Sequence, residues 1–236
     1  QNLNSDHLNL TNESNEKSRS SFFIQQNLNS DHLNLTNESN EKSNISSYGI
    51  TIVQQELDFI IDKESNEAYI IGNEYTNSEI FIPQFIIHEK ENYVVSKIMQ
   101  GSFKDTKVQS IFIPHDSKVT TIERDALFNS SIECLYIPES ISELNKGWCS
   151  NTPNLNKMII SPNNKYFIYF DSCMVLGKSD QNSDIYDTLL FVNRKVKYIL
   201  IPSFIKYISS HSFENSEIEN FTIPSSIITI CERAFN

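Results

Sequence analysis

A short β-prone run that ends in proline recurs along most of this chain. The runs are IFIP at 80–83 and 111–114, LYIP at 135–138, MIISP at 158–162, ILIP at 199–202 and FTIP at 221–224. Their prolines are 31, 24, 24, 40 and 22 residues apart. A repeated interval of this length, with longer intervals where a unit carries an insertion, is typical of a solenoid.

The large and apolar residues between the prolines recur at fixed distances from one another. The large residue Phe103 is followed by apolar residues at +5, +8 and +10 and by proline at +11. Leu127 and Phe213 are followed by apolar residues and proline at the same offsets. Unrelated strands that merely end in proline do not account for three such matches. After each proline come a spaced apolar pair, a small residue and a large one, and in the last unit these are Ile227, Ile230, Ala234 and Phe235.

This pattern predicts a coil that repeats along the chain. The last two apolar residues of each run alternate and point inward, so each coil adds one short strand to a parallel sheet. Proline lacks an N–H group and therefore ends that strand. The chain then returns along the other side, where the small residue allows close approach and the large residue fills the interior. We expect Ile223, Ile227, Ile230 and Phe235 to be the inward set of the last coil.

The repeat resembles the BspA-type leucine-rich repeat, most clearly in IENFTIPSSIITICERAF and VQSIFIPHDSKVTTIERDAL. The resemblance extends over roughly residues 50–236. It implies an α/β repeat solenoid, a leucine-rich-repeat-type right-handed coil with a short-strand parallel sheet, mostly β and loop with short helical turns. The cysteine that the family usually carries three residues after the Phe is replaced here by Thr106, Ser130 and Ser216.

A polar leader precedes the repeats. Residues 1–18 recur unchanged at 26–43, and both copies are rich in Asn and Ser but poor in apolar residues. So little apolar surface cannot offset the entropy lost on ordering a chain. We therefore predict that residues 1–44 form a duplicated leader that is disordered or weakly helical.

Residues 45–236 are predicted to form the repeat domain. Two strand-like runs around the turn-like DKESNE predict a hairpin, and the resemblance places an N-terminal hairpin segment at 48–75. It also implies a hairpin-bearing insertion repeat at 162–202. A last coil without a neighbour leaves an open sheet edge, so we expect the array to be truncated at its C-terminal end.

Composition excludes several classes of function. A net charge of −11 disfavours nucleic acid as a partner, and only five glycines disfavour phosphate-binding loops. No apolar run reaches the roughly 20 residues needed for a transmembrane segment. We find no pattern for a catalytic, cofactor-binding or metal site, so we predict no enzyme activity and no cofactor. The four cysteines form no CxxC pair and their disulfide state is open; they are Cys134, Cys149, Cys173 and Cys231.

One face of the predicted sheet carries candidate binding residues. The residue between the two inward positions of each strand points outward, and most of these residues are large and apolar. Stacked coil on coil, they form an apolar stripe with a polar rim, which is typical of protein-binding surfaces. β-Propensity alone, or a neighbouring segment that covers the stripe, explains the pattern equally well. The predicted partner-binding residues are Phe81, Phe112, Tyr136, Ile159, Leu200, Lys157 and Tyr198.

The resemblance implies a non-catalytic, cell-surface or secreted protein for adhesion or protein recognition, with a host or matrix protein as partner. The alternative is a structural spacer in a longer surface protein. A metal-dependent enzyme or calcium-binding module that uses the loop DQNSD at 180–184 is the least favoured hypothesis. The oligomeric state stays open.

Overall fold

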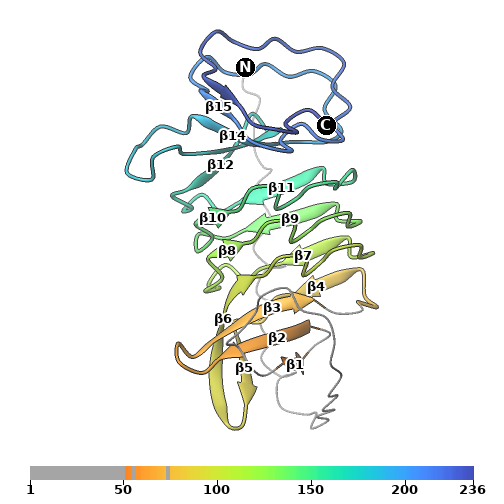
Figure 1. Cartoon of the computed structure of the whole chain (residues 1–236), viewed down its shortest axis with the longest axis vertical. Coiled ribbons are helices and arrows are strands. Elements are labelled where there is room, and N and C mark those ends of the chain that lie inside the picture. Colours follow the sequence, from red (N-terminus) through yellow and green to blue (C-terminus); the bar gives the residue numbers. More distant parts are fainter. Residues whose placement is uncertain (1–50, 55–56, 73–74) are drawn as a thin grey trace, which may run out of the picture. The chain divides into compact units, whose positions relative to one another are not determined.

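The computed structural model describes residues 51–54, 57–72 and 75–236 (Figure 1). Every regular element in these ranges is a β-strand, and no α-helix occurs there. Consequently, none of these residues belongs to a helix long and apolar enough to cross a membrane. The predicted leader, 1–44, lies outside the described residues.

The described part begins with antiparallel strands. β2 and β3 form the hairpin expected from the sequence, with Phe59 opposite Ile70. β5 and β6 form a second hairpin, and β6 continues beside β3 in parallel. These strands are β1 (Thr51–Gln54), β2 (Leu57–Asp62), β3 (Glu67–Gly72), β5 (Phe85–His88) and β6 (Glu91–Ile98).

The first four proline-ended runs build a four-stranded parallel sheet, which we call the front sheet. Its strands follow one another as successive coils (Figure 1), in the order β4, β7, β9 and β11. The register aligns equivalent positions of the repeat, so Ile111 lies beside Ile80 and Leu135. The strands are β4 (Glu79–Phe81), β7 (Ser110–Phe112), β9 (Cys134–Ile137) and β11 (Lys157–Ile160).

The other side of most coils carries a two-residue strand, and the short helical turns that the resemblance implied do not occur among the described residues. β8 and β10 extend the sheet of β6, and β15 and β16 extend the sheet of β14. Three of the four strands consist of Thr or Tyr followed by Ile. Such β-branched and aromatic residues favour an extended backbone. The strands are β8 (Thr121–Ile122), β10 (Glu143–Leu144), β15 (Tyr207–Ile208) and β16 (Thr229–Ile230).

The long interval between Pro162 and Pro202 contains an antiparallel meander. β13 pairs with β12 on one side and with β14 on the other. β14 then pairs in parallel with β15, so the regular coils resume from this insertion. The strands are β12 (Phe167–Phe170), β13 (Met174–Gly177) and β14 (Thr188–Val192).

The inward positions form the core, as the repeat pattern predicted. Phe103, Ile113, Ile122, Leu135 and Ile208 are all buried. A fully buried side chain of this size stabilises the fold by about 1.5–3 kcal/mol. Because like residues stack on like residues, each coil closes the core of the coil before it.

In four coils a turn with left-handed backbone follows the strand opposite the front sheet, and the stacked Asn and Asp side chains of these turns form what we call the asparagine ladder. Asp105, Asn129, Asn151 and Asn215 have φ between 50° and 59°, a conformation that Asn and Asp tolerate best after Gly. Asn129 Nδ2 donates to Asp105 Oδ1 at 2.6 Å, and Asn151 Nδ2 donates to Asn129 Oδ1 at 2.8 Å. Asn215 Nδ2 continues the ladder to Asn151 Oδ1 at 3.2 Å. The ladder thus links successive coils through side-chain amides.

The last coil departs from the expected burial. Ile223 and Ile230, assigned to its inward set, are each 44% exposed, and Phe235 is 41% exposed. Ile227 packs partly against the core, and Ala234 is buried as expected. These exposed residues occupy the positions of the coil that are buried in other coils, but no further coil covers them within the described residues.

Candidate functional site

The outward residues of the front sheet form a continuous column across its four strands, which we call the aromatic column: Phe81, Phe112, Tyr136 and Ile159. The rings of Phe81 and Phe112 stack with centroids 4.9 Å apart and planes 15° apart. Phe81, Phe112 and Ile159 are 49%, 37% and 44% exposed, and Tyr136 is half-buried. The parallel register therefore places four of the seven predicted residues side by side on one surface.

A second, more polar row flanks the aromatic column. Lys157 lies beside Cys134, and Cys134 lies beside Ser110. The Lys157 side chain is exposed and Cys134 is half-buried. Partial burial raises the pKa of the Cys134 thiol, and the nearby Lys157 ammonium opposes this effect. Glu79 continues the row beside Ser110 on β4, so the row presents one anion, one cation and neutral polar groups beside the column.

Tyr198 and Leu200 do not join the front sheet. The ladder of backbone hydrogen bonds continues from Leu155 O to Arg194 N at 3.4 Å, but no strand beyond that point pairs with the open edge of β11 in the described residues. The cause is the insertion, which lets the chain diverge from β11 after Arg194. The predicted stripe of outward residues is therefore interrupted after Ile159.

The two displaced residues form a separate exposed surface. Tyr198 and Leu200 are 68% and 78% exposed, which is among the highest values of the large apolar side chains in the described residues. Tyr198 forms an isolated parallel bridge with Asn220, and its hydroxyl donates to Glu219 Oε2 at 3.2 Å. Together with Phe221 they line a shallow depression of about 500 Å³.

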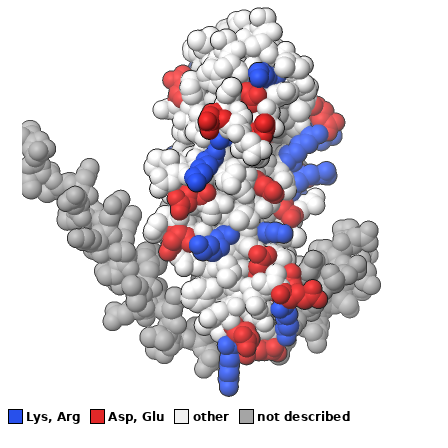
Figure 2. Space-filling model, turned by 90° about the vertical axis from the view of Figure 1, so that its left-hand side faces the viewer, with Lys and Arg blue, Asp and Glu red and all other residues white. Residues whose placement is uncertain are grey.

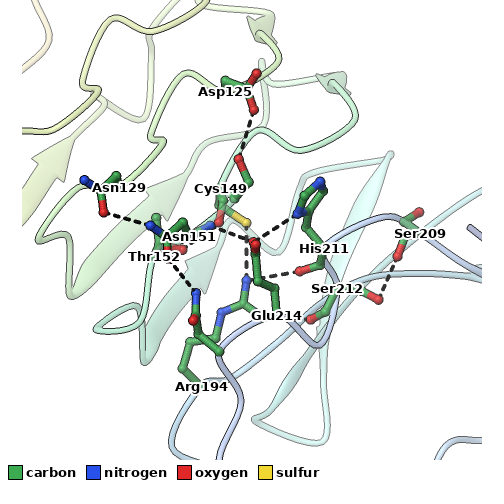
Figure 3. A network of polar contacts seen from close by, with 12 residues as sticks. Asp125, Asn129, Cys149, Asn151, Thr152, Arg194, Ser209, His211, Ser212 and Glu214 are labelled. Atoms are coloured by element: carbon green, nitrogen blue, oxygen red, sulfur yellow. Dashed lines mark hydrogen bonds and ion pairs between the residues drawn. The ribbon is translucent and has the colours of Figure 1, made fainter. Parts of the chain in front are cut away.

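A buried polar cluster joins the coils on either side of the insertion (Figure 3), and we call it the junction network: Cys149, Asn151, Arg194, His211 and Glu214. Arg194 is fully buried. Its Nη1 donates to Ser212 O at 3.0 Å and its Nη2 to His211 O at 3.2 Å. The guanidinium also lies over the Phe191 ring, 4.6 Å from the centroid. Its side chain thus occupies the space between two coils.

Glu214 supplies the opposite charge of the junction network. Its Oε2 accepts a hydrogen bond from Asn151 N at 2.6 Å and lies 3.0 Å from His211 Nδ1. Burial lowers the pKa of the Arg194 guanidinium, while the nearby Cys149 thiol and Glu214 carboxylate oppose this effect. In regular coils the turns are joined by backbone bonds such as Leu127 N to Trp148 O. Across the insertion, these side-chain contacts add to the backbone hydrogen bond from Arg194 N to Leu155 O.

The junction network does not present reactive chemistry. Burial raises the pKa of the Cys149 thiol to about 12, so it stays protonated and is a poor nucleophile at neutral pH. No group of three or more His, Cys, Asp or Glu side chains in the described part of the chain is placed to hold a metal ion. In the loop compared with a calcium site, Asp180 Oδ1 accepts from Asn182 N at 2.9 Å, an ordinary turn contact. We therefore assign the network to stability.

The sequence analysis missed a second exposed apolar group. Phe85, Ile87 and Val94 lie on the β5–β6 hairpin and are 46%, 58% and 38% exposed. Phe85 is opposite Val94, and Ile87 is on the same face two residues later. In the sequence FIIH the side chains alternate between the two faces of the strand, and Ile86 is buried. This alternation alone places Phe85 and Ile87 on the opposite, exposed face. This group provides a natural comparison for the aromatic column.

Charge does not single out another site. On the face shown in Figure 2, Lys and Arg side chains are interspersed with Asp and Glu. Several pairs are close, such as Lys195 Nζ with Glu217 Oε1 at 2.8 Å and Lys146 Nζ with Glu232 Oε1 at 2.8 Å. Exposed pairs like these contribute little energy. A surface of mixed sign does not attract polyanions in the way that a basic patch does.

A family model of the BspA type leucine rich repeat region matches residues 70–187 and 168–236, with six copies. No curated protein of similar sequence was found. Among solved structures, a leucine-rich repeat protein from Eubacterium ventriosum has a TM-score of 0.50 and 19% identity, and the match covers 77% of this chain and 62% of that one. A leucine rich cell surface protein from Faecalibacterium prausnitzii has a TM-score of 0.44 and 15% identity, with 78% and 73% covered. The pneumococcal vaccine antigen PcpA has a TM-score of 0.40 and 13% identity, with 77% and 72% covered. At such identities a likeness concerns the fold alone.

Proposed function

Because this chain belongs to the family of BspA-type leucine-rich repeat proteins, we propose that it is a non-catalytic recognition module at the cell surface or secreted. It binds a host or matrix protein through the front sheet. Membership in this repeat family suggests a protein-interaction or surface module in general. The proposal adds the surface that makes the contact and the kind of partner.

The observation that carries the proposal is the aromatic column. Phe81 and Phe112 are stacked at 4.9 Å and yet exposed, so their rings are already ordered before a partner arrives. Immobilising a side chain on binding costs roughly 0.5–1.5 kcal/mol, and an ordered pair avoids most of that cost. Aromatic side chains of this kind dominate the binding energy of protein interfaces.

The surroundings of the column fit a protein partner. The flanking row of Ser110, Cys134 and Lys157 supplies hydrogen-bond donors beside an apolar centre. An apolar centre with a polar rim is the arrangement of specific protein interfaces. Tyr198 and Leu200, although outside the front sheet, form a second exposed group that a large partner could contact.

The test is a binding measurement with two matched double variants. Purified fibronectin, laminin and fibrinogen are immobilised, and binding of the whole chain is measured by biolayer interferometry. Phe112→Ser with Tyr136→Ser removes the centre of the column, whereas Phe85→Ser with Ile87→Ser removes exposed apolar area elsewhere. Circular dichroism establishes that both variants are folded.

We expect the Phe112/Tyr136 variant to lose at least about a hundredfold in affinity, since two central aromatic contacts are removed. The Phe85/Ile87 variant should bind like the parent chain. Equal binding by a folded Phe112/Tyr136 variant rules out the front sheet as the binding surface. Binding of the parent to none of the three proteins contradicts the assignment of a matrix partner and favours a spacer role.

A further inference from the structure

The front sheet has an open edge at β11, in the interior of the chain (Figure 1). β11 pairs with β9 on one side, and no strand in the described ranges pairs with its other side. The next coil meets the start of β11, where Arg194 N donates to Leu155 O at 3.4 Å. Asn193 Nδ2 also donates to Asn156 O there, at 2.6 Å. The insertion then leads the chain away, so the edge beyond Asn156 is open although further coils follow it.

This open edge presents backbone groups that have no strand to pair with in the part of the chain that the structure describes. Lys157 N and Ser161 N donate to carbonyl oxygens of the preceding coil, at 3.0 and 2.9 Å. Successive residues of a parallel strand direct their backbone groups to alternate sides, so those of Met158 and Ile160 point to the open edge. Another extended backbone satisfies such groups, which is the chemistry of strand addition.

Side-chain exposure marks the same gap in the aromatic column. Ile159, the last residue of the column, is 44% exposed. Leu200, which the repeat spacing assigns to the position next to Ile159, is instead 78% exposed. A strand that pairs with β11 places an outward side chain against Ile159 and lengthens the column by one residue.

Lys157 gives the open edge a charge that the chain does not neutralise. Lys195 and Lys197 pair with Glu217 and Glu219 at 2.8 and 3.3 Å. No carboxylate of the described residues lies within ion-pair distance of Lys157. An acidic side chain on a neighbouring strand would supply that partner. A second copy is a poor occupant, because pairing two β11 edges brings two such ammonium groups onto one small surface.

The inward side of the gap is already filled. Met158 is 3% exposed and Arg194 is 0% exposed. A strand added at the open edge therefore has room for large side chains on its outward face only, and its inward residues must be small. The pattern that fits is an acidic residue beside Lys157, a small residue beside Met158 and an aromatic residue beside Ile159.

We propose that an extended segment of the protein partner, with the pattern acidic–small–aromatic, adds to the front sheet as a parallel strand at the open edge of β11. The parallel direction continues that of the four strands already in the sheet. This inference rests on the proposed function, because it specifies how the partner extends the aromatic column. Its experiment uses a peptide and no matrix protein, so the two proposals can fail separately.

Fluorescence polarisation of a labelled peptide, Gly-Ser-Glu-Ala-Phe-Ala-Ser-Gly, with the whole chain tests the proposal. We expect a dissociation constant of about 0.1–1 mM, since only a few residues pair. The same peptide with Lys in place of Glu should bind about fivefold more weakly, since like charges then lie side by side. The net charge of −11 favours the Lys peptide non-specifically, so a preference for Glu reports the site itself. Lys157→Glu should reverse this preference, and Lys118→Glu, at another exposed lysine, should not.

Two N-methylated forms of the Glu peptide test the backbone contact. In the parallel register the Phe amide points to β11, and the amide of the Ala before it points away. Methylation at Phe should weaken binding at least about tenfold, because it removes one hydrogen bond and places a methyl group between the strands. Methylation at that Ala should leave binding unchanged.

Each outcome decides for or against the proposal. Reversal of the charge preference by Lys157→Glu, with loss of binding on methylation at Phe only, supports it. Circular dichroism establishes that the variants are folded, and Lys157→Gln, which should abolish the preference, serves if Lys157→Glu does not fold. The absence of saturable binding of the Glu peptide overturns the proposal, and so does an equal effect of the two methyl groups. A charge preference that Lys157→Glu leaves unchanged also overturns it, since the peptide then binds elsewhere and another occupant, such as a second copy, holds the edge.

Discussion

Replacing Arg194 by Ala is expected to destabilise the protein strongly, because this side chain joins coils that the insertion separates. Arg194 is 0% exposed and donates to the carbonyl oxygens of His211 and Ser212 at 3.2 and 3.0 Å. Ser212 O also accepts from Val192 N at 2.9 Å, so it keeps one partner in the variant. The substitution therefore leaves His211 O without the guanidinium and Glu214 without the positive charge beside it.

The size of the effect follows from these losses. Truncating a fully buried large side chain removes its packing and leaves His211 O without its hydrogen-bond donor, which together cost about 3–5 kcal/mol. For a chain of this length each kcal/mol lowers the melting temperature by roughly 2–4 °C, which gives about 6–20 °C. Arg194→Met keeps the packing over the Phe191 ring and should cost less than Arg194→Ala. The pair Arg194→Met and Glu214→Gln should show a coupling of roughly 0.5–3 kcal/mol in a double-mutant cycle.

Urea unfolding followed by tryptophan fluorescence measures this effect where it arises. The chain has one tryptophan, Trp148, which is 3% exposed and lies 6.3 Å from Phe191. Its emission therefore reports the junction network, while far-UV circular dichroism reports all coils. The reasoning is refuted if Arg194→Ala costs less than about 1 kcal/mol, or if the cycle shows no coupling to Glu214.

Three further outcomes are expected. Gly72→Ala should cost about 1–3 kcal/mol in thermal melting, because φ is +113° and a Cβ would lie 2.7 Å from Ser102 O. Burial alone would raise the pKa of the Asp187 carboxyl, but hydrogen bonds from the Ser179 N–H and hydroxyl outweigh burial and lower it. That stabilisation is complete above the unfolded pKa of 3.8 and is lost as pH falls through the lower folded pKa, so Asp187→Asn should reduce the acid sensitivity seen in melts below pH 3.8. Cys149, whose pKa burial raises to about 12, should react with Ellman's reagent at pH 8 only after unfolding in urea.

The sequence predicted the coil because its core positions recur at fixed offsets. Phe103, Leu127 and Phe213 are each buried where the repeat assigns them to the interior. The same phase placed Phe112 and Tyr136 on the outer surface of the front sheet. Periodic burial can be read from a sequence because each coil repeats the same local environment.

The features that the sequence did not reveal lie where the repeat is interrupted. Arg194 belongs to the polar stretch NRKVK, and such a stretch normally faces solvent. The sequence did contain one indication of this contact. Other coils carry a small residue followed by Phe or Leu, whereas Trp148–Cys149 has the large residue first and leaves the small Cys149 at the position of Phe or Leu. The structure places the Arg194 Nη2 atom 3.9 Å from Cys149 Sγ. Only a three-dimensional contact between residues far apart in the sequence shows this compensation.

Asparagine shows the same limit in another way. Its abundance in the chain has a simple explanation in nucleotide composition, yet Asn129, Asn151 and Asn215 have a structural role at left-handed positions. The interruption of the outward stripe after Ile159 was equally hidden, since Leu200 fits the repeat by spacing alone. Strand pairing depends on the path of the insertion, which the spacing of prolines does not specify.

The central claim is that the front sheet is the recognition surface, and hydroxyl-radical footprinting of the unmodified chain tests it most directly. Oxidation of each aromatic side chain is measured by mass spectrometry with and without the matrix protein that binds most tightly. The account predicts that the partner protects Phe81, Phe112 and Tyr136 and leaves Phe85 unchanged. Protection of Phe85 without protection of Phe112 and Tyr136 would contradict it.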